Sequence, residues 1–535
     1  MAQRTGRKKG ARPTGLVWMP RVELTKGEAF VCKRLTRVGR LFAFLRKHRR
    51  ELFDDAFQAE LATMYADRSR GTPPRPPAFM AMVVLLQAYE QKSDAAAVEE
   101  TVFDRRWQMV LDCAGAQEPP FSQGVLVEFR RRLIESGLDR RLIERTVELA
   151  QKTGEFGYKQ LRVALDSSPL WGAGRVEDTF NLIGHALEVV VDCAAVVLHI
   201  DEAAVRREAG LTLVGGSSLK AALDIDWDDA QAQQDALERL LGEVRRLKTW
   251  LSDRVGEGAN DPPLREALEL LERIIEQDLE PDPDGGGRMR IKRGVSRDRR
   301  ISVTDGDMRH GRKSKSRVIN GYKRHIAREL DHGLILAATV RPANEPEQQA
   351  ADIMRPDIER FGPLAELHVD RAFLGSELAV EMHDTGRRLL AKPWPVRNGN
   401  RFPKTDFDID LESGVVRCPE GQLAVIRGRT ARFDGDTCRR CPSRDRCTRS
   451  KLGRGRSIAI HPHENMLSSL RRLKSRPGGR AALRERVAIE HALAHVGQRQ
   501  GRRARYRTAR KNTFDLRRVA AVENLHTIER MCRAA

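Results

Sequence analysis

Apolar side chains recur at helical spacing through the first 150 residues of the chain. Two helices are indicated by the sets Leu41, Phe44, Leu45, Leu52 and Met82, Val83, Leu86, Tyr89. The prolines within residues 73–77 separate these helices. Ser122 is placed to cap a third helix, on which Arg130, Arg131 and Arg132 fall largely off the apolar face. Residues 27–155 are therefore predicted to form a helical domain with basic faces.

The pattern changes at Leu161, where apolar and polar residues begin to alternate. This alternation predicts a strand that ends at Asp166. Helical spacing then returns, and a Pro- and Gly-rich run over residues 281–287 predicts a linker at its end. Two long helices are predicted in between, over Gln231–Val255 and from Pro263 onward. We expect residues 176–287 to be a helical insertion.

A second alternating region begins after residue 320. Its predicted elements are strands over Tyr322–Arg328 and Leu334–Val340, a helix over Glu347–Ile353 capped by Asn344, a strand over Leu364–Val369, a helix over Ser376–Asp384 and a strand over Arg388–Ala391. The run Asp331-His332-Gly333 supplies the turn between the first two strands. This order predicts an α+β multi-domain protein whose mixed-sheet core is formed by residues 156–175 and 288–398.

The composition adds a polyanionic partner to this picture. The 535 residues include 96 Lys and Arg against 75 Asp and Glu, a net charge of +21. Such an excess favours binding to phosphate backbones, and the aromatic share of 5% disfavours a platform that stacks single-stranded bases. The basic residues 1–26 are predicted to be a disordered arm. No apolar run is expected to span a membrane, because the longest, near Ala186–Ile200, contains Glu188 and Asp192.

The charge is unevenly distributed along the chain. Basic residues gather in the arm and in segments 288–328, 439–449 and 499–511, whereas 228–285 is acidic by comparison. The segment 499–511 holds seven Lys and Arg and no acid, so it repels itself unless a polyanion is present. The basic N-terminus lacks the apolar core of a secretory signal, and the cysteine usage suits a reducing compartment. We expect a cytoplasmic, nucleoid-associated protein with no membrane partner.

Three acidic residues are candidates for catalysis. Asp166 and Asp370 each follow an apolar strand, at the edge where α/β sheets place reactive groups. Glu490 lies on a helix predicted over Arg480–Val496 and shares a face with Arg486. Two strand aspartates and a helix glutamate can hold two Mg²⁺ ions about 4 Å apart, which activate a hydroxyl and stabilise the leaving oxygen in phosphodiester displacement. Taken singly, each residue has a simpler explanation as a capping residue or as half of an i,i+4 ion pair.

Four of the eight cysteines lie within 30 residues, at Cys418, Cys438, Cys441 and Cys447. Four thiolates in a tetrahedral array suit a structural Zn²⁺ ion, and the central pair has the two-residue spacing of such sites. The five residues between the last pair exceed the usual spacing, and free thiols or an exposed redox cluster remain as alternatives. A cysteine-rich, zinc-binding insertion is expected over residues 399–460. It would carry Arg439, Arg440, Arg444 and Arg446 towards DNA.

Several motifs, in their order, resemble bacterial insertion-sequence transposases of the DDE type. They are PPRPPAFMAMVVLLQ at 73–87, ALDSSPLWG at 164–172, DGDMRHGRKSKSRVINGYKRH at 305–325, RPANEPE at 341–347, LHVDRAF at 367–373, the cysteine cluster, RERVAIEHALAHV at 484–496, Arg502–Asn512 and Asn524-Leu525. The resemblance implies an RNase H-like catalytic core with an N-terminal helical DNA-binding domain and C-terminal core helices over 461–535. It further implies that Asp166, Asp370 and Glu490 hold two Mg²⁺ or Mn²⁺ ions per active site.

Related transposases often carry Tyr, Arg, Glu and Lys at fixed spacing on the last catalytic helix. On this chain the pattern falls on Leu483, Arg486, Glu490 and Gly497, so that only the Arg and the Glu match. Arg499, Arg502 or Arg503 could replace the missing Lys. Glu485 and Glu464 are the rival third acids. Asp305 and Asp307 could serve a metal or phosphate network, or could be solvated loop acids.

The resemblance implies an enzyme that cleaves transposon ends and joins the 3′-hydroxyl to target DNA. Its partners would be double-stranded terminal repeats and target DNA, bound by a homodimer or a higher oligomer when the ends are synapsed. The residues expected to contact DNA are Arg309, His310, Arg312, Lys313, Lys323, His325, Arg371, Arg486, Arg499, Arg502, Arg503, Arg505, Arg507 and Lys511. For His325, a structural histidine within its strand is an equally good explanation. Two alternatives remain open, a nuclease of the same fold that cuts without joining and a catalytically inactive DNA-binding protein derived from a transposase.

Overall fold

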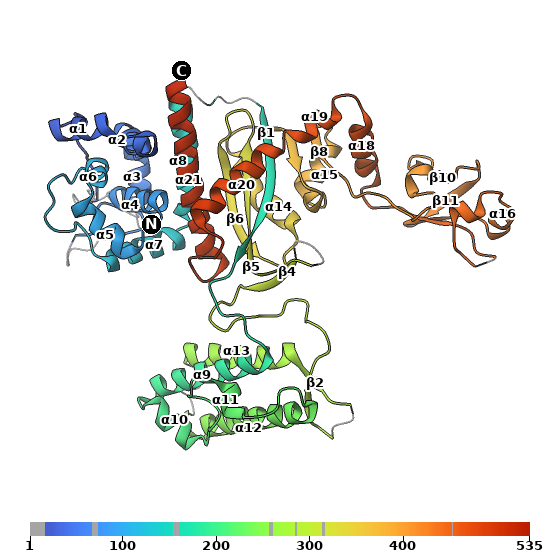
Figure 1. The fold of residues 1–535 in the computed structure, drawn as a ribbon, viewed down its shortest axis with the longest axis horizontal. Helices are drawn as coiled ribbons and strands as arrows, with labels where there is room; N and C mark the ends of the chain where they lie inside the picture. Colours follow the sequence, from blue (N-terminus) through green and yellow to red (C-terminus); the bar gives the residue numbers. More distant parts are fainter. Residues whose placement is uncertain are drawn as a thin grey trace, which may run out of the picture.

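The computed structural model describes residues 16–66, 73–153, 156, 160–255, 261–283, 286–312, 316–451 and 453–534. Figure 1 shows four parts: an N-terminal helical domain, a central mixed sheet, a helical insertion on one side of the sheet and a small β domain at the end of an arm. Two helices, α8 (Arg141–Lys152) and α21 (Ala509–Ala534), run side by side between the N-terminal domain and the sheet.

The N-terminal domain consists of short helices around one fully buried helix. Before α8 it contains α1 (Lys26–Arg34), α2 (Arg40–Leu52), α3 (Asp55–Ala62), α4 (Pro77–Glu90), α5 (Asp94–Phe103), α6 (Arg105–Leu111) and α7 (Gln123–Glu135), with 3-10 turns at Arg37–Gly39 and Leu138–Arg140. Helix α4 begins at Pro77 and is buried through Ala88, so it forms the centre of the domain. The Ser122 hydroxyl accepts a hydrogen bond from the Val125 N–H, as the sequence predicts for the cap of α7.

Two expectations for this domain are wrong. Arg130 is buried rather than displayed on a basic face, because both of its terminal nitrogens bond the carboxylate of Asp94. This contact holds the pKa of Asp94 down at about 2. Residues 16–20 are not a free arm, since Leu16 and Trp18 are buried and the Trp18 N–H donates to Gln58 at 2.7 Å. Residues 1–15 of the predicted arm lie outside the described residues.

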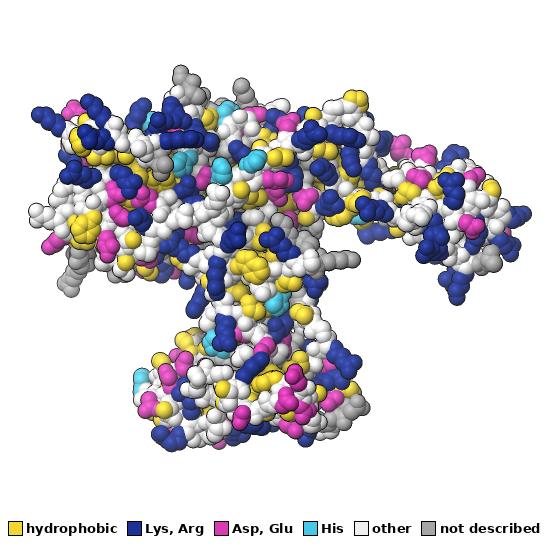
Figure 2. Space-filling view, in the orientation of Figure 1, with side chains coloured by type: hydrophobic (Ala, Val, Ile, Leu, Met, Phe, Trp, Pro, Cys, Tyr) yellow, Lys and Arg dark blue, Asp and Glu magenta, His cyan; other side chains and the backbone are white. Residues whose placement is uncertain are grey.

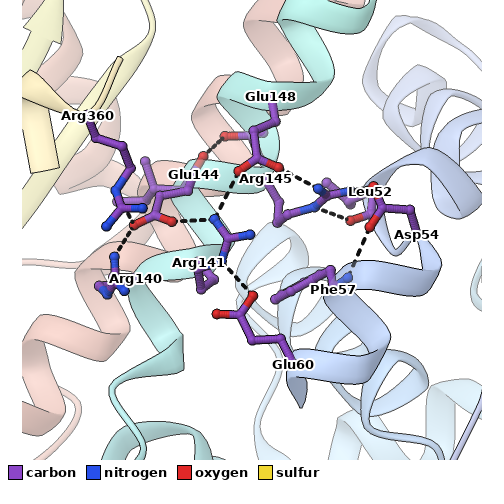
Figure 3. Close-up of polar contacts among 12 residues, drawn as sticks. Leu52, Asp54, Phe57, Glu60, Arg140, Arg141, Glu144, Arg145, Glu148 and Arg360 are labelled. Atoms are coloured by element: carbon purple, nitrogen blue, oxygen red, sulfur yellow. Dashed lines mark hydrogen bonds and ion pairs between the residues drawn. The ribbon is translucent and has the colours of Figure 1, made fainter. Parts of the chain in front are cut away.

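A network of arginines and carboxylates joins α8 to the other helices of the N-terminal domain on one side and to the core on the other (Figure 3). Glu144 is 1% exposed and accepts from Arg140, while Arg360 lies 3.4 Å from it. Arg145 donates to the Leu52 carbonyl at 2.9 Å and pairs with Asp54 at 2.7 Å. Since buried charges are tolerated only when they are paired, this network fixes the orientation of the N-terminal domain on the core.

The central sheet is mixed, as the sequence predicts. Its strands are β1 (Leu161–Trp171), β4 (Arg309–Arg312), β5 (Val318–Glu329), β6 (Ile335–Pro342), β7 (Leu364–Val369) and β8 (Arg388–Ala391). The long strand β5 is antiparallel to β1, β4 and β6, whereas β1, β7 and β8 are mutually parallel. The accompanying helices are α14 (Glu347–Glu359), α15 (Glu377–Asp384), α18 (Glu464–Ser475), α19 (Gly479–Arg484) and α20 (Val487–Gln500). Helix α21 packs on β6, and α20 packs on β1.

Three local predictions for the core need correction. The first strand does not end at Asp166 but continues to Trp171, because its second half pairs with β5. Asn344 does not cap α14, whose N-cap is Pro346; its amide donates to Asp298 instead. The helix predicted over Arg480–Val496 is two helices, α19 and α20, separated by a turn at residues 485–486.

The helical insertion has its own core. It contains α9 (Thr179–Leu198), α10 (Glu202–Glu208), α11 (Leu219–Leu223), α12 (Ala230–Val255), α13 (Pro262–Asp278) and the hairpin of β2 (Leu279–Pro281) with β3 (Met289–Ile291). The Pro- and Gly-rich run is therefore the connection of a hairpin and not a linker out of the insertion. The chain leaves the insertion later, since Arg299 pairs with Asp278 at 2.5 Å and Val303 belongs to its core.

One helix among the described residues, α9, is long and apolar enough to cross a membrane by length and composition. This corrects the expectation that no apolar run approaches such a length. Half of the residues in the most apolar stretch of α9 are buried, and the helix packs against α10, α11, α12 and α13. Its composition is accounted for by its place at the centre of the helical insertion.

The last part, which we call the cysteine domain, spans residues 399–460. It contains the 3-10 turn Lys404–Asp406, the antiparallel strands β9 (Asp408–Asp410), β10 (Val415–Arg417), β11 (Leu423–Arg427), β12 (Thr430–Arg432) and β13 (Ser457–Ala459), and the short helices α16 (Gly435–Arg439) and α17 (Arg444–Cys447). Its described core is limited to Phe407, Val416, Ala424, Ala431, Phe433 and Ile458. The domain projects from the sheet on the side of β8, α18 and α19 (Figure 1).

Candidate active site

A cleft of about 1040 Å³ opens at the edge of the sheet where β7 ends. The pairing of β1 with β7 ends at Leu165 and Val369, so the next residues along the two strands, Asp166 and Asp370, are neighbours at this edge. Helix α20 contributes Glu490 to the same cleft. The cleft thus brings together the three acidic residues that the sequence singles out.

The two aspartates are held differently. Asp166 accepts from the N–H of Ser167 at 2.8 Å, and its side chain is 15% exposed. Asp370 caps the 3-10 turn Arg371–Phe373 and accepts from the Arg371 N–H at 2.7 Å, yet 45% of its side chain remains exposed. The simpler explanation of Asp370 as a cap is therefore correct, and it leaves the carboxylate open to the cleft.

Arg486 connects the first acid with the third. Its guanidinium donates to the Oδ2 atom of Asp166 at 2.7 Å and to the Oε1 atom of Glu490 at 2.7 Å. Burial raises the pKa of Asp166, and the charge of Arg486 opposes this effect. Glu490 is half exposed, so its i,i+4 pair with Arg486 leaves one side of the carboxylate facing the cleft.

The donor chemistry of this cleft fits a hard divalent cation. Carboxylate oxygens are the ligands that Mg²⁺ and Mn²⁺ prefer, and Asp166 and Asp370 are adjacent. Across the described ranges, however, the one group of three His, Cys or carboxylate ligand atoms within 4.8 Å of one another is that of Glu366, His368 and Glu485. Within the cleft, the Arg486 guanidinium instead bridges the carboxylates of Asp166 and Glu490.

Neither rival third acid lies in the cleft. Glu485, in the turn before α20, is paired with Arg162. Glu464 is 1% exposed and pairs with Lys404 and with Arg471, the latter at 2.9 Å. The structure therefore supplies other partners for both residues.

The residues predicted to contact DNA lie in different surroundings. Four of them line the cleft: Arg312, Lys323, Arg371 and Arg486. Others have structural partners: Arg309 pairs with Asp298 at 2.7 Å, His310 bonds Asn320 at 2.8 Å, and Arg499 bonds Glu523 at 2.8 Å and the Tyr89 carbonyl at 2.6 Å. Lys313 lies outside the described residues.

His325 is the clearest wrong prediction of a DNA contact. It is 1% exposed on the central strand β5 and packs edge-on against Phe373. Burial lowers its pKa to about 3, so the ring is neutral at physiological pH. A strand that is covered on both faces hides both sets of alternating side chains, and alternation in the sequence does not reveal this.

The basic segment 499–511 runs from the end of α20, through the loop 501–508, into the first turn of α21. Its backbone continues the sheet, since the Trp171 N–H donates to the Arg502 carbonyl at 3.0 Å and the Ala504 N–H donates to the Trp171 carbonyl at 2.6 Å. This pairing fixes the backbone of the segment along the edge of the sheet. Its exposed side chains are those of Arg502, Arg503, Arg505, Arg507 and Lys511.

Two aspartates that anchor this segment were not recognised from the sequence. Asp305 is fully buried and accepts from the Tyr322 hydroxyl and from the Thr508 N–H, the latter at 3.0 Å. Asp307 accepts from the Ala509 N–H at 2.8 Å, at the start of α21. Their explanation as solvated loop acids is thus wrong. Their partners in the segment, Thr508 and Ala509, lie about 200 positions away, so no local pattern could have identified these contacts.

The four clustered cysteines line one cavity of about 70 Å³ in the cysteine domain. Cys418 follows β10, while Cys438, Cys441 and Cys447 come from the two short helices and the turn between them. All four thiols are free, and burial raises the pKa of Cys447. Four soft sulfur donors around so small a cavity fit the ligand chemistry of Zn²⁺, although no three of them meet the 4.8 Å spacing.

Comparison with known families gives two matches. A model described as a transposase DDE domain matches residues 420–529, and a model described as a transposase domain (DUF772) matches residues 39–132. No curated protein and no solved structure matches the chain. The first match contains Arg486, Glu490 and the basic segment, and the second covers most of the N-terminal helical domain. Asp166 and Asp370 lie outside both matches.

Proposed function

We propose that this chain, which belongs to the insertion-sequence transposases of the DDE type, cleaves transposon ends and joins the released 3′-hydroxyl to target DNA. The observation that carries the proposal is the convergence of Asp166, Asp370 and Glu490 on one cleft. The first two acids are separated by more than 200 residues and the last two by 120, yet all three face the same solvent-filled space. The order of the strands, with antiparallel β6, β5 and β1 followed by parallel β7 and β8, supports an RNase H-like core.

The three carboxylates would hold the divalent metal ions, Mg²⁺ or Mn²⁺, that this family implies. Bound there, such ions lower the pKa of the attacking hydroxyl and neutralise charge on the leaving oxygen. The chain's own residues would align the DNA: Arg312, Lys323 and Arg371 line the cleft and can neutralise phosphates beside the scissile bond. Arg486 would hold the acids of β1 and α20 in register.

The exposed side chains of the basic segment extend this surface beyond the cleft. Arg502 and Arg503 lie where the segment pairs with the end of β1, the strand that carries Asp166. Phosphates of a duplex that enters the cleft would therefore meet arginines on the same strand edge. We further propose a structural Zn²⁺ ion at the four cysteines, a homodimer or higher oligomer in the synapsed state, and a site of action in the cytoplasm at the nucleoid.

Substitution of the acids tests the catalytic assignment. The substrate is a duplex made from the DNA that flanks the gene. Asp370→Asn and Glu490→Gln should each lower its cleavage rate about 10³-fold or more, because neutral amides hold divalent cations poorly. Binding of the same duplex should stay within about twofold of the unaltered protein. Asp384→Asn, which changes an exposed carboxylate at the end of α15, serves as the matched control and should cleave normally.

A second substrate separates joining from cutting. A duplex with a pre-cut 3′-hydroxyl end should be joined to plasmid DNA by the unaltered protein and not by Glu490→Gln. Cleavage without any joined product would favour the nuclease that cuts without joining. Full cleavage by both acid variants would remove the catalytic assignment and leave a DNA-binding role.

A further inference from the structure

Helix α20, which carries Glu490, is fastened to the sheet by arginines at both ends. At its start, Arg328 of β5 donates to the Ala488 carbonyl. At its end, Arg324 of the same strand donates to the Gln500 side chain at 3.0 Å and to the Gly501 carbonyl at 3.0 Å. The helix thus spans the sheet between two fixed points, and the turn that precedes it sets its rotation.

That turn contains Glu485 and Arg486, side by side. Glu485 forms an ion pair with Arg162 of β1, while Arg486 reaches Asp166 four residues further along the same strand. Arg162 is itself held by Glu366 at 3.0 Å and by Asp331 at 2.8 Å. Two adjacent residues of the turn are therefore tied to two points on one strand.

The register of the sheet connects the ion pairs of Arg162 with the cleft. Arg162 of β1 pairs directly with Glu366 of β7. Each lies four residues before a candidate catalytic aspartate, so each shares a strand face with Asp166 or Asp370. Glu366 is buried and also bonds His368 at 2.5 Å and Arg388 at 2.6 Å, which leaves it no freedom to move.

The same cluster could be taken for a metal site, since ligand atoms of Glu366, His368 and Glu485 lie within 4.8 Å. Its charges argue against this. Arg162 donates to both carboxylates, and Arg388 donates to Glu366, so a cation there would displace or oppose two guanidinium groups. An ion-pair network that fixes a turn accounts for all of these contacts.

We propose that Glu485 is a positioning residue of the active site: its ion pair with Arg162 fixes the turn between α19 and α20 and thereby places Arg486 and Glu490 over Asp166. This inference rests on the proposed function, because its effect is on the rate of DNA cleavage. Glu485 does not line the cleft, so we expect it to act through the turn.

A graded series at Glu485 tests the proposal with the flanking-DNA duplex and Mn²⁺. Glu485→Lys repels Arg162 and should lower kcat about 50-fold, and Glu485→Ala should lower it about tenfold, since misplacement by about 1 Å costs up to about 100-fold. Glu485→Gln keeps an oxygen that accepts from Arg162 and should stay within about threefold. KM for DNA should change by less than about twofold throughout, because Glu485 does not line the cleft.

Two controls separate the outcomes. Glu359→Gln removes a surface pair with Arg355 elsewhere on the core and should leave kcat unchanged. If Glu490→Gln is inactive while Glu485→Lys has normal kcat, the positioning role is wrong and the proposed function stands. If Glu490→Gln is active, the proposed function itself fails. Equal losses in Glu485→Gln and Glu485→Ala, together with one fewer Mn²⁺ bound per chain by calorimetry, would overturn the proposal in favour of a metal site.

Discussion

The two insertions differ in how they are held together. The helical insertion buries 28 hydrophobic residues in one described cluster, drawn from all five of its helices. The cysteine domain buries six in its own cluster, over strands that are mostly three residues long. Domains with so small a core usually need a disulfide or a metal ion to fold. From this comparison we expect hydrophobic burial alone to suffice for the first insertion, and the second to need its four thiols.

The two insertions also differ in charge. Residues 176–287 contain 10 Lys and Arg against 25 Asp and Glu, whereas residues 399–460 contain 14 against 8. In Figure 2 the outer end of the cysteine domain, at the right, shows mainly Lys and Arg, while the helical insertion, below, shows patches of Asp and Glu among its basic residues. An acidic surface is repelled by a phosphate backbone and a basic one is attracted. The comparison therefore favours the cysteine domain over the helical insertion for the DNA contact that we propose.

Metal removal should break the comparison most strongly. A chelator is expected to unfold the cysteine domain and to leave the helical insertion intact, because a structural Zn²⁺ ion contributes about 10 kcal/mol or more to domains of this kind. Limited proteolysis followed by mass spectrometry would locate new cleavage sites within residues 399–460 alone.

Paired cysteine variants supply the control for metal removal. Cys438→Ser should have the same effect as the chelator. Cys193→Ser changes a cysteine that packs on the core of the helical insertion and should produce no new cleavage site in the cysteine domain. A chelated protein that resists protease throughout residues 399–460 would contradict the dependence on zinc.

An identical truncation in each core should sharpen the difference. Ile458→Ala in the cysteine domain and Ile274→Ala in α13 both remove a side chain that is at most 2% exposed. Each should cost about 2–5 kcal/mol of local stability, from lost burial and the cavity left behind. The smaller core has less to lose before it unfolds, so hydrogen exchange should become fast across β10–β13 in the first variant. Hydrogen exchange in α9 and α13 should stay slow in Ile274→Ala. Fast exchange there, with slow exchange across β10–β13 in Ile458→Ala, would show that the small core is the more stable one.

The sequence predicts best those elements whose bounds are set locally. The strands Leu364–Val369 and Arg388–Ala391 have the predicted bounds, because each is a short apolar run between breakers. The cap at Ser122 is correct for the same reason, since a cap is a contact with a backbone N–H three residues away.

Predictions failed where a distant partner decides the structure. The run after Asp166 has turn composition, but pairing with β5, more than 150 residues later, keeps it extended. Arg130 is buried because Asp94, 36 residues earlier, neutralises it. In the cleft, the i,i+4 pair of Arg486 with Glu490 was visible in the sequence. The bond of Arg486 to Asp166 spans 320 residues and was not.

The smallest expected effect concerns two arginines with almost equal exposure. Arg439 of the cysteine domain is 53% exposed and pairs with Asp436, and Arg265 of the helical insertion is 55% exposed and pairs with Glu269. If only the basic insertion meets DNA, Arg439→Ala should weaken duplex binding about two- to fivefold and reduce the slope of log affinity against log salt by about 1, as loss of one phosphate contact requires. Arg265→Ala should change neither quantity. Equal losses in both variants, measured by fluorescence anisotropy at several salt concentrations, would mean that the acidic insertion also lies on DNA and that net charge does not distinguish the two.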